Sequence, residues 1–286
     1  MPKPESLLPT DSIAEAGEAV RRIAGDVPRP LAIIAGSGLV GLAGALSLEH
    51  RIAPDAIPHL PPPSVLGHHG GLLIGRIGPL GTVFFAGRAH LYEGWSPLES
   101  VFAVDLAAQL GAKILLATNA TGGVSPHLQP GDLMLLTDQI NLTFRNLPAN
   151  SMKQSHSDGI GRLGPFYDSH LGEMMREAAR HEKINLKRGI YVGMLGPSYE
   201  TRAEAAMLGR IGADVVGMST VAEVTAARLA GLRVVGISCI ANVVPKWGLN
   251  QAVTHSDVLD RVAGAVEKLK RLIARWAGML ANDANG

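Results

Sequence analysis

Short, almost purely apolar runs alternate along this chain with segments whose apolar residues recur at helical spacing. Strands covered on both faces of a sheet have near-continuous apolar sequences, and they alternate with helices when the sheet is mostly parallel. The sequence therefore predicts an α/β fold in three layers, a mostly parallel mixed β-sheet with helices on both faces. The expected strands are LAIIAG (31–36), TVFFAG (82–87), KILLATNATGG (113–123), DLMLLTDQI (132–140), GIYVGML (189–195), ADVVGM (213–218) and LRVVGISCIAN (232–242).

The helical segments carry recognisable start signals. In SPLESVFAVDLAAQLG (96–111), Ser96 can cap the first turn and Glu99 completes a capping box. Thr220 and Glu223 have the same spacing and predict a second capping box. No linker-like segment separates the elements, so we expect a single domain over residues 1–286. Further helices are expected over residues 12–24, 169–182 and 201–212, and after Thr254.

Composition excludes several classes of partner. The 26 Lys and Arg residues balance 25 Asp and Glu residues, so no basic surplus exists to hold a nucleic acid backbone. Cys239 is the only cysteine and lies in an apolar run, where a buried inert thiol is expected rather than a nucleophile. The N-terminal residues do not resemble a secretion signal, and no apolar run has membrane-spanning length. We expect no membrane partner and a cytoplasmic setting.

Ligands of open α/β sheets bind beyond the carboxyl ends of the strands, so the loops that follow the strands are the candidate sites. The first loop, GSGLVG (36–41), has the spacing of a dinucleotide fingerprint, and an NAD-dependent oxidoreductase is therefore one alternative. That interpretation needs an acidic residue closing a second strand, and Asp55 lies among prolines instead. The alternatives are a phosphate held by backbone N–H groups and the Ser37 hydroxyl, or a plain tight turn.

The next two loops also suit an anion. In GRAHLYEGW (87–95), Arg88, His90 and Tyr92 alternate along an extended chain and point to one side. A guanidinium can bind phosphate oxygens with paired hydrogen bonds, although an exposed strand end has the same pattern. Asn119 begins TNATGG, which predicts a turn of small residues with backbone N–H groups facing an anion.

Three later segments offer groups for a flat, polar ligand. Glu200 in GPSYETRAE (196–204) can cap a helix or accept hydrogen bonds from ring N–H groups, and Tyr199 can stack on a ring. Ser219, after VVGM, can cap a helix or bind phosphate. Met218 beside it suits a core position equally well. Asn242 ends a buried apolar strand, where its amide needs hydrogen-bond partners.

A metal site is not expected. His68 and His69 are adjacent and point opposite ways on an extended chain, and no third ligand stands at metal-like spacing. His255 opens the last helix, where a solvated histidine is the ordinary interpretation.

Taken together, the segments resemble the trimeric branch of the purine nucleoside phosphorylase family. The resemblance extends from IIAGSGL to THSDVL, and the order of the blocks is more specific than any one block. It implies a partly barrel-like sheet, purine nucleosides and inorganic phosphate as substrates, no cofactor, and a homotrimer. The matching blocks are GSGL, GHHG, GRAHLYEGW, TNATGG, GDLMLLTDQINL, GPSYETRAE, GADVVGMSTVAEV and the pair of Asn242 with His255.

The resemblance also implies roles for individual residues. Asn242 and Glu200 would hold the purine base, His255 the 5′-hydroxyl, and these three with His90 form the expected catalytic set. A neighbouring subunit would lend an aromatic side chain to the sugar pocket, with Phe166 as the candidate. The phosphate-binding set would be Ser37, His68, Arg88, His90, Ala120 (through its backbone) and Ser219. The base- and ribose-binding set would be Tyr92, Tyr199, Glu200, Val216, Met218, Asn242 and His255.

Departures from the family pattern bear on base preference. Thr121 replaces a frequent alanine, Ala241 replaces a frequent threonine, and VVPKWGLNQAV (243–253) is unlike related sequences. A methylthioadenosine phosphorylase is the nearest rival, but that family carries aspartate where this chain has Asn242 and a smaller apolar residue where it has His255. A nucleoside-binding protein without catalysis is a further alternative. The pattern favours a phosphorylase of 6-oxopurine nucleosides that functions in purine salvage.

Overall fold

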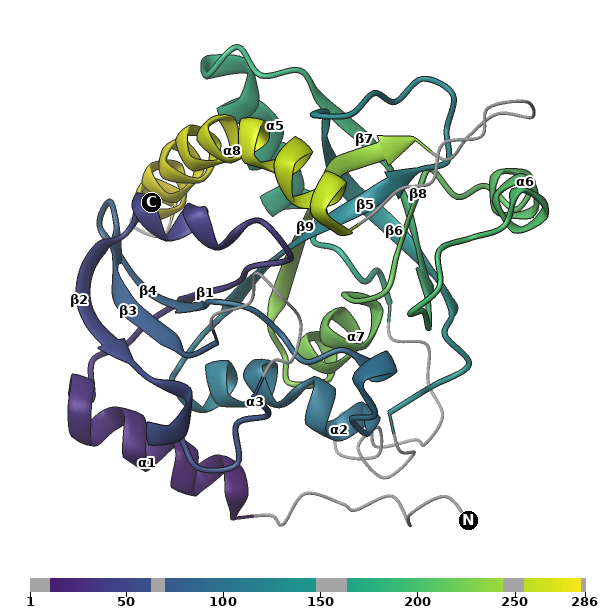
Figure 1. Cartoon of the computed structure of the whole chain (residues 1–286). Coiled ribbons are helices and arrows are strands. Elements are labelled where there is room, and N and C mark those ends of the chain that lie inside the picture. Colours follow the sequence, from purple (N-terminus) through teal and green to yellow (C-terminus); the bar gives the residue numbers. More distant parts are fainter. Residues whose placement is uncertain (1–10, 63–69, 148–163, 244–254, 284–286) are drawn as a thin grey trace, which may run out of the picture.

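A nine-stranded mixed sheet organises the chain in the computed structural model (Figure 1). The structure describes residues 11–62, 70–147, 164–243 and 255–283, with side chains in the last helix from residue 262 onward. The strands are β1 (Leu31–Ile34), β2 (Ser47–Ile52), β3 (Leu72–Ile77), β4 (Leu80–Phe85), β5 (Ile114–Gly123), β6 (Leu133–Leu142), β7 (Leu186–Met194), β8 (Val215–Gly217) and β9 (Arg233–Val243).

The strand order is β2-β3-β4-β1-β5-β8-β7-β6-β9, and β5 also pairs with β9. The last five strands in this order therefore form a closed ring of pairings. Strand β1 is parallel to both β4 and β5, and β5 is parallel to β9. The carboxyl ends of these four strands consequently meet at one edge, as the expected mostly parallel arrangement requires.

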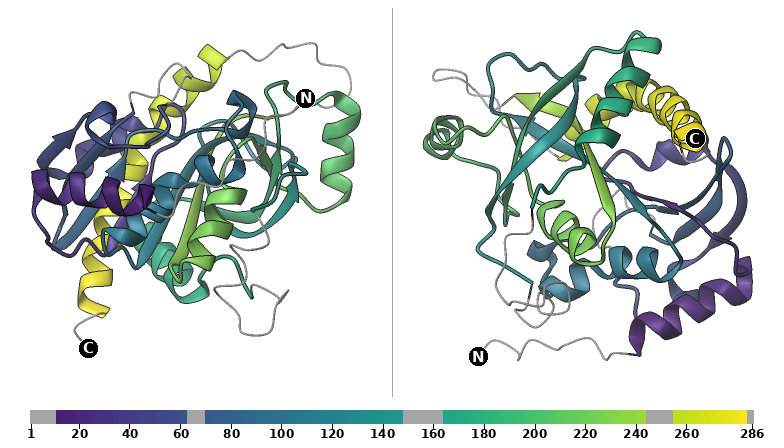
Figure 2. Two further views of the ribbon diagram at one scale, coloured as in Figure 1. Left: turned by 90° about the horizontal axis from the view of Figure 1, so that it is seen from below. Right: turned by 180° about the vertical axis from the view of Figure 1, so that it is seen from behind.

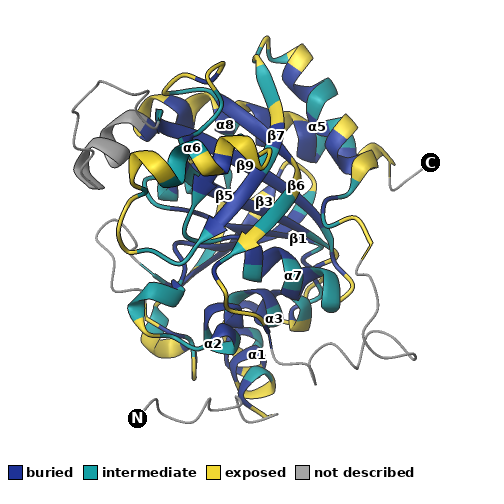
Figure 3. Cartoon of the chain, turned by 90° about the vertical axis from the view of Figure 1, so that its right-hand side faces the viewer, coloured by how far each residue is buried: buried dark blue, intermediate teal, exposed yellow. Residues whose placement is uncertain are grey.

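Helices cover both faces of the sheet, which confirms the predicted layers (Figures 1 and 2). One core cluster lies between the sheet and α1, α3 and α7, and the other lies between the sheet and α5 and α8. Figure 3 shows the buried strands enclosed between these helices. The helices are α1 (Ser12–Ala24), α2 (Pro97–Ser100), α3 (Phe102–Gln109), α5 (Ser169–His181), α6 (Arg202–Arg210), α7 (Val221–Leu229) and α8 (His255–Asp283), with 3-10 helices η1 (Val40–Ala45), η2 (Pro54–Ala56) and η3 (Leu91–Glu93).

The capping box at Ser96 is confirmed, but the helix it starts is short. The Ser96 hydroxyl accepts from the Glu99 N–H, and the Glu99 carboxylate accepts from the Ser96 N–H. The predicted continuous helix then breaks at Val101, so α2 and α3 are separate elements. Strands β2 and β3 were not predicted; β2 is mostly exposed at the sheet edge and lacks the apolar run of a central strand.

The glycine loop after β1 does not open a dinucleotide site. The loop leads into η1 and then into β2, which pairs antiparallel with β3. A dinucleotide fold needs an α-helix that begins at the glycine loop and crosses to a parallel strand. The oxidoreductase interpretation is therefore wrong for GSGLVG.

Cys239 is fully buried in β9, as expected, and burial raises the pKa of its thiol to about 12. At that pKa roughly one thiol in ten thousand is ionised at pH 8, and the thiolate is the reactive form. We expect no reaction with Ellman's reagent in the native protein and the release of one equivalent of chromophore after unfolding in guanidinium chloride. Rapid labelling of the native protein would contradict the buried placement.

Candidate active site

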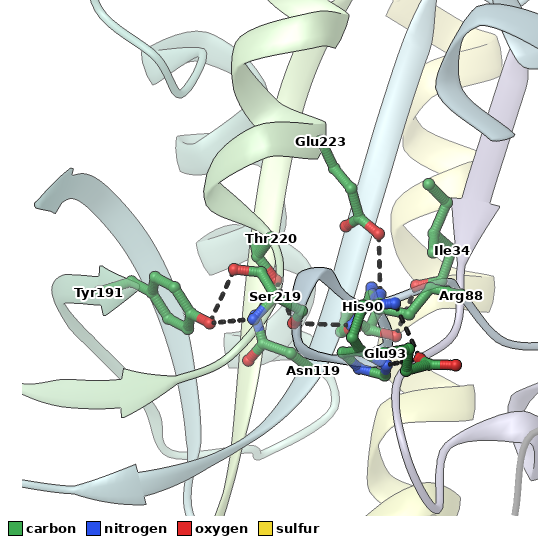
Figure 4. A network of polar contacts seen from close by, with 10 residues as sticks. Ile34, Arg88, His90, Glu93, Asn119, Tyr191, Ser219, Thr220 and Glu223 are labelled. Carbon is green, nitrogen blue, oxygen red and sulfur yellow. Dashed lines mark hydrogen bonds and ion pairs between the residues drawn. The ribbon is translucent and has the colours of Figure 1, made fainter. Parts of the chain in front are cut away.

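The Arg88 side chain follows β4 and is buried in a cage of protein oxygens (Figure 4). Its Nε donates to Glu223 at 2.8 Å, Nη1 donates to the Ser219 hydroxyl at 3.1 Å, and Nη2 donates to the Thr118 carbonyl at 2.8 Å. These three partners come from α7, from the segment before α7 and from β5. The guanidinium plane is therefore fixed from three sides.

Glu223 is the charge partner of Arg88. Both side chains are at least 95% buried, with relative exposures of 2% for Arg88 and 5% for Glu223. The predicted capping box of Thr220 with Glu223 is wrong, because the Thr220 side chain makes no cap hydrogen bond. The carboxylate bonds Arg88 instead, since a buried guanidinium needs an anion more than a helix terminus does.

Ser219 and Thr220 form the tight connection between β8 and α7. The two hydroxyls lie 3.0 Å apart, and the Asn119 amide donates to the Thr220 hydroxyl at 2.8 Å. The side-chain Oδ1 of Asn119 accepts from the Ser238 hydroxyl at 2.7 Å. Residues 119–123 belong to β5 and do not form the predicted turn, because pairing with β8 and β9 continues to Gly123.

His90 is held by Glu93 and stacked on Tyr92. The Glu93 carboxylate lies 2.7 Å from His90 Nδ1 and accepts from the His90 backbone N–H at 2.8 Å. The His90 and Tyr92 rings stack with centroids 4.8 Å apart. The predicted extended alternation ends at His90, since Tyr92 lies in η3. Burial, followed by the Glu93 charge, raises the pKa of Tyr92 to about 12, so its hydroxyl keeps its proton.

One pocket brings two of the anion-binding candidates, His90 and Ser219, together with Met218. His90, Met218, Ser219, Thr220 and Glu223 line it, so residues predicted from separate loops do meet. The pocket lining combines hydroxyls and an imidazole with the apolar thioether of Met218, and the Arg88 guanidinium lies next to Ser219. Such a lining suits an anion that is joined to a less polar group.

Two glycines permit this convergence. A Cβ on Gly36 would lie 2.8 Å from the Asn119 Cα and 3.2 Å from Arg88 Nη1. A Cβ on Gly196 would overlap the Met218 sulfur and approach the Tyr92 ring at 3.2 Å. The glycine loop after β1 and the GPSYE segment therefore reach the site only because they lack side chains there.

The candidate base-binding groups lie around the same carboxyl edge. Val216 of β8 and Asn242 of β9 are both register partners of Gly122 on β5, and both are buried. The β5–β9 register shifts between Thr121 and Gly122, so Ala241 is the extra residue of a bulge that re-aims the end of β9.

Glu200 and Tyr199 precede α6. Thr201, not Glu200, caps α6 by accepting from the Glu204 N–H, so the capping alternative for Glu200 is wrong. Burial raises the pKa of the Glu200 carboxyl. Tyr199 is 47% exposed, which leaves much of its side chain open to solvent.

Two further phosphate-binding candidates lie on segments that reach the site. Ser37 is half-buried in the loop after β1, and Ala120 lies beside Asn119 in β5. His68 lies outside the described residues, as does the side chain of His255 at the start of α8. The roles of Glu200 and Asn242 in binding the base stay predictions. Within the described ranges, no group of three or more His, Cys, Asp or Glu residues is placed to hold a metal ion.

Sequence reasoning missed the residues that hold the site together. Glu223 was assigned to a helix cap, Glu93 had no role, and Tyr191 was assigned only to a strand. A buried acidic residue in an apolar helix was the available signal for Glu223.

In the part of the chain that the structure describes, no helix combines the length and apolar character needed to span a membrane.

Known proteins with similar sequences include purine nucleoside phosphorylases. A model of the phosphorylase superfamily matches residues 30–277. Purine nucleoside phosphorylase 1 of Bacillus subtilis (strain 168) is 34% identical over 270 residues, which cover 93% of this chain and 99% of that protein. The purine nucleoside phosphorylase of Rattus norvegicus is 36% identical over 251 residues, which cover 85% and 86% of the two chains.

Solved structures agree with these relatives. Schistosoma mansoni purine nucleoside phosphorylase in complex with inosine superposes with a TM-score of 0.86 at 29% identity, covering 96% of this chain and 98% of that chain. The chain therefore belongs to the phosphorylase superfamily and, within it, to the purine nucleoside phosphorylases. It is accordingly an enzyme of the pentosyltransferase class.

The buried ion pair has a measurable consequence for stability. We expect Glu223→Ala to lower the free energy of unfolding by about 3–5 kcal/mol, because the Arg88 charge would stay buried without its carboxylate. Urea denaturation followed by circular dichroism measures this change. Glu267→Ala is the control: it removes an exposed pair with Lys270 and should cost less than about 1 kcal/mol. Equal losses in both variants would contradict the importance of the buried pair.

Proposed function

We propose that this phosphorylase cleaves 6-oxopurine nucleosides, such as inosine and guanosine and their 2′-deoxy forms, with inorganic phosphate as co-substrate and no cofactor. The products are the free base and (deoxy)ribose 1-phosphate, and the role is purine salvage. The observation that carries the proposal is the fixed Arg88 guanidinium, which donates to the Ser219 hydroxyl. Ser219 in turn lines a pocket together with His90 and Met218.

The phosphate would bind at the carboxyl edge of β1, β4 and β5. Arg88, His90 and Ser219 supply side-chain groups there, with Ser37, His68 and the Ala120 backbone as further proposed contacts. Charged hydrogen bonds of this kind are stronger than neutral ones and fix the orientation of the anion. The Thr121 hydroxyl does not add to this set in our proposal, because it donates to the Cys239 carbonyl at 3.4 Å.

Bond breaking creates two charges that the site must stabilise. A phosphate oxygen attacks C1′ while the C1′–N9 bond breaks and its electron pair passes to the purine. The sugar is cationic in the transition state, and the phosphate beneath it lowers the energy of that cation. Holding phosphate and nucleoside in this geometry contributes up to roughly 7–11 kcal/mol in the best cases.

The leaving purine is the other charge. The Asn242 amide can donate and accept, so it can bind O6 and N7 of a 6-oxopurine as the base takes up a proton. Glu200 would accept from the opposite N–H edge, with Tyr199 against the ring. Val216, Tyr92 and Met218 would contact the base and ribose, and His255 the 5′-hydroxyl.

A substrate panel tests this assignment. Schistosoma mansoni purine nucleoside phosphorylase has been solved with inosine, guanosine and adenosine. We propose that this chain takes inosine and guanosine well and adenosine and methylthioadenosine poorly, in each case only when phosphate is present. Preferential use of methylthioadenosine would support the rival phosphorylase, and purine binding without cleavage would support a binding protein.

Assembly and location complete the proposal. We propose a homotrimer in the cytoplasm, in which a neighbouring subunit supplies an aromatic side chain to the sugar pocket. Phe166 packs against the core of its own chain, which argues against it. Phe144 is 87% exposed at the end of β6, next to the pocket residue Thr143, and is the better candidate.

Asn242→Ala should lower the turnover number with inosine at least about tenfold, because the leaving base loses a hydrogen bond that strengthens in the transition state. Steady-state kinetics at saturating phosphate measures the change. The unfolding temperature should stay close to that of the parent, since Asn242 ends its strand. A near-normal turnover would refute the role of Asn242.

Arg88→Lys should raise the KM for phosphate by about ten- to a hundredfold and leave the KM for inosine nearly unchanged. Lysine keeps the positive charge opposite Glu223, so the variant tests the fork-shaped guanidinium and not the buried charge. Initial rates over a phosphate series at saturating inosine measure the effect. An unchanged phosphate requirement would remove Arg88 from the site.

A further inference from the structure

The segment that carries Ser219 has a strained backbone. Thr220 has φ 69° and ψ −48°, and the Val221 N–H donates to the Ser219 carbonyl at 2.7 Å. These values define a γ-turn of the rare form, which is unfavourable for any residue with a side chain and more so for a β-branched one. Such a turn persists only where surrounding contacts hold it.

Tyr191 of β7 supplies contacts of this kind (Figure 4). Its hydroxyl donates to the Ser219 carbonyl at 3.0 Å and accepts from the Ser219 N–H at 3.2 Å. One side-chain atom therefore satisfies both backbone polar groups of Ser219. The Tyr191 side chain is fully buried, and burial raises its pKa, so the hydroxyl stays a donor at neutral pH.

The neighbouring strand is built to admit this hydroxyl. Gly217 of β8 precedes the turn, and Gly193 of β7 is its register partner. A Cβ on Gly217 would lie 2.6 Å from the Tyr191 hydroxyl oxygen. Glycine at position 217 thus leaves the space through which the tyrosine reaches Ser219.

The backbone turn at Thr220 also fixes the positions of the groups that surround Arg88. The Ser219 hydroxyl precedes Thr220 and Glu223 follows it, and both accept hydrogen bonds from the Arg88 guanidinium. Asn119 holds the Thr220 hydroxyl on the other side of the turn. Removing the Tyr191 hydroxyl would release the turn on one side only and leave the rest of the site intact.

We propose that Tyr191 is a positioning residue for phosphate: its hydroxyl holds the turn at Thr220 so that the Ser219 hydroxyl stands beside Arg88. This inference rests on the proposed phosphate site. Tyr191 itself touches no substrate. Its effect should therefore appear in the use of phosphate and not in the binding of the nucleoside.

Tyr191→Phe tests the proposal, because it keeps the ring and removes one oxygen atom. We expect the KM for phosphate to rise about tenfold, which corresponds to the loss of one or two hydrogen bonds. The KM for inosine should change less than about twofold. Gly217→Ala should reproduce the effect from the other side, since its methyl group displaces the intact hydroxyl. This second variant keeps the test open if the first one folds poorly.

Tyr167→Phe is the matched control. Tyr167 is also a buried tyrosine, and its hydroxyl donates to Gln139 at 3.2 Å. A general cost of losing a buried hydroxyl would lower the unfolding temperature in both variants, whereas the KM for phosphate should rise only in Tyr191→Phe. A rise of similar size in the control, or an equal rise for both substrates in Tyr191→Phe, would overturn the proposal.

Ser219→Ala separates this inference from the phosphate site on which it rests. If Ser219→Ala leaves the KM for phosphate unchanged, the proposed site is wrong. If Ser219→Ala raises it and Tyr191→Phe does not, the site stands and the positioning role is wrong. When both single variants raise the KM for phosphate, the double variant should have a KM only slightly higher than that of Ser219→Ala, because Tyr191 acts through Ser219. Fully additive effects would overturn the proposal.

Discussion

The burial of the Arg88 guanidinium is the constraint on which this site depends. Arg88 is buried at the end of β4, and a buried cation is tolerable only with an anion and with hydrogen-bond acceptors. Glu223 supplies the anion, while Thr118 and Ser219 supply acceptors. These partners belong to β5 and to the start of α7, so the fold must bring three distant segments together before the cation can be accommodated. The ion pair is neutral overall, so the hydrogen-bonding geometry of Arg88 is left to orient an incoming anion.

The glycines of the site explain how so many segments can approach one point. Gly36, Gly196 and Gly217 each stand where a Cβ would lie within 3 Å of another group. Those groups are Asn119, Met218 and Tyr191 respectively. In each case a residue with a function at the site, or a support for one, occupies the space that a side chain would need. The sequence motifs GSGL, GPSYE and VVGMST are therefore packing requirements as much as ligand loops.

The fold class and the site loops were predictable because both depend on local patterns. Apolar runs and helical spacing mark the central strands, and the segments that follow these strands contain Arg88, His90 and Ser219. Strand β2 was not predictable in this way, because an exposed edge strand has no apolar run. The role of Glu223 was hidden for a different reason: its spacing from Thr220 satisfies the rule for a helix cap, and only the three-dimensional position of Arg88 overrides that local preference. Tyr191 gave no signal, since a tyrosine in a strand is ordinary until its hydroxyl is seen to bond both polar groups of one residue.

Strand β9 carries residues on both the phosphate side and the base side of the proposed site. Its Ser238 hydroxyl donates to Asn119, which in turn donates to Thr220 in the turn beside Arg88. Four residues further along the same strand, past the bulge at Ala241, is Asn242. A strand paired on both sides moves as a unit, so Ser238, which supports the turn at Thr220, and Asn242, the amide proposed to bind the base, share one rigid element. The distance between the two is then set by the backbone of β9, and the bulge adjusts the direction of Asn242 without disturbing Ser238. In the proposed mechanism, this arrangement keeps a fixed separation between the groups for the phosphate and for the base.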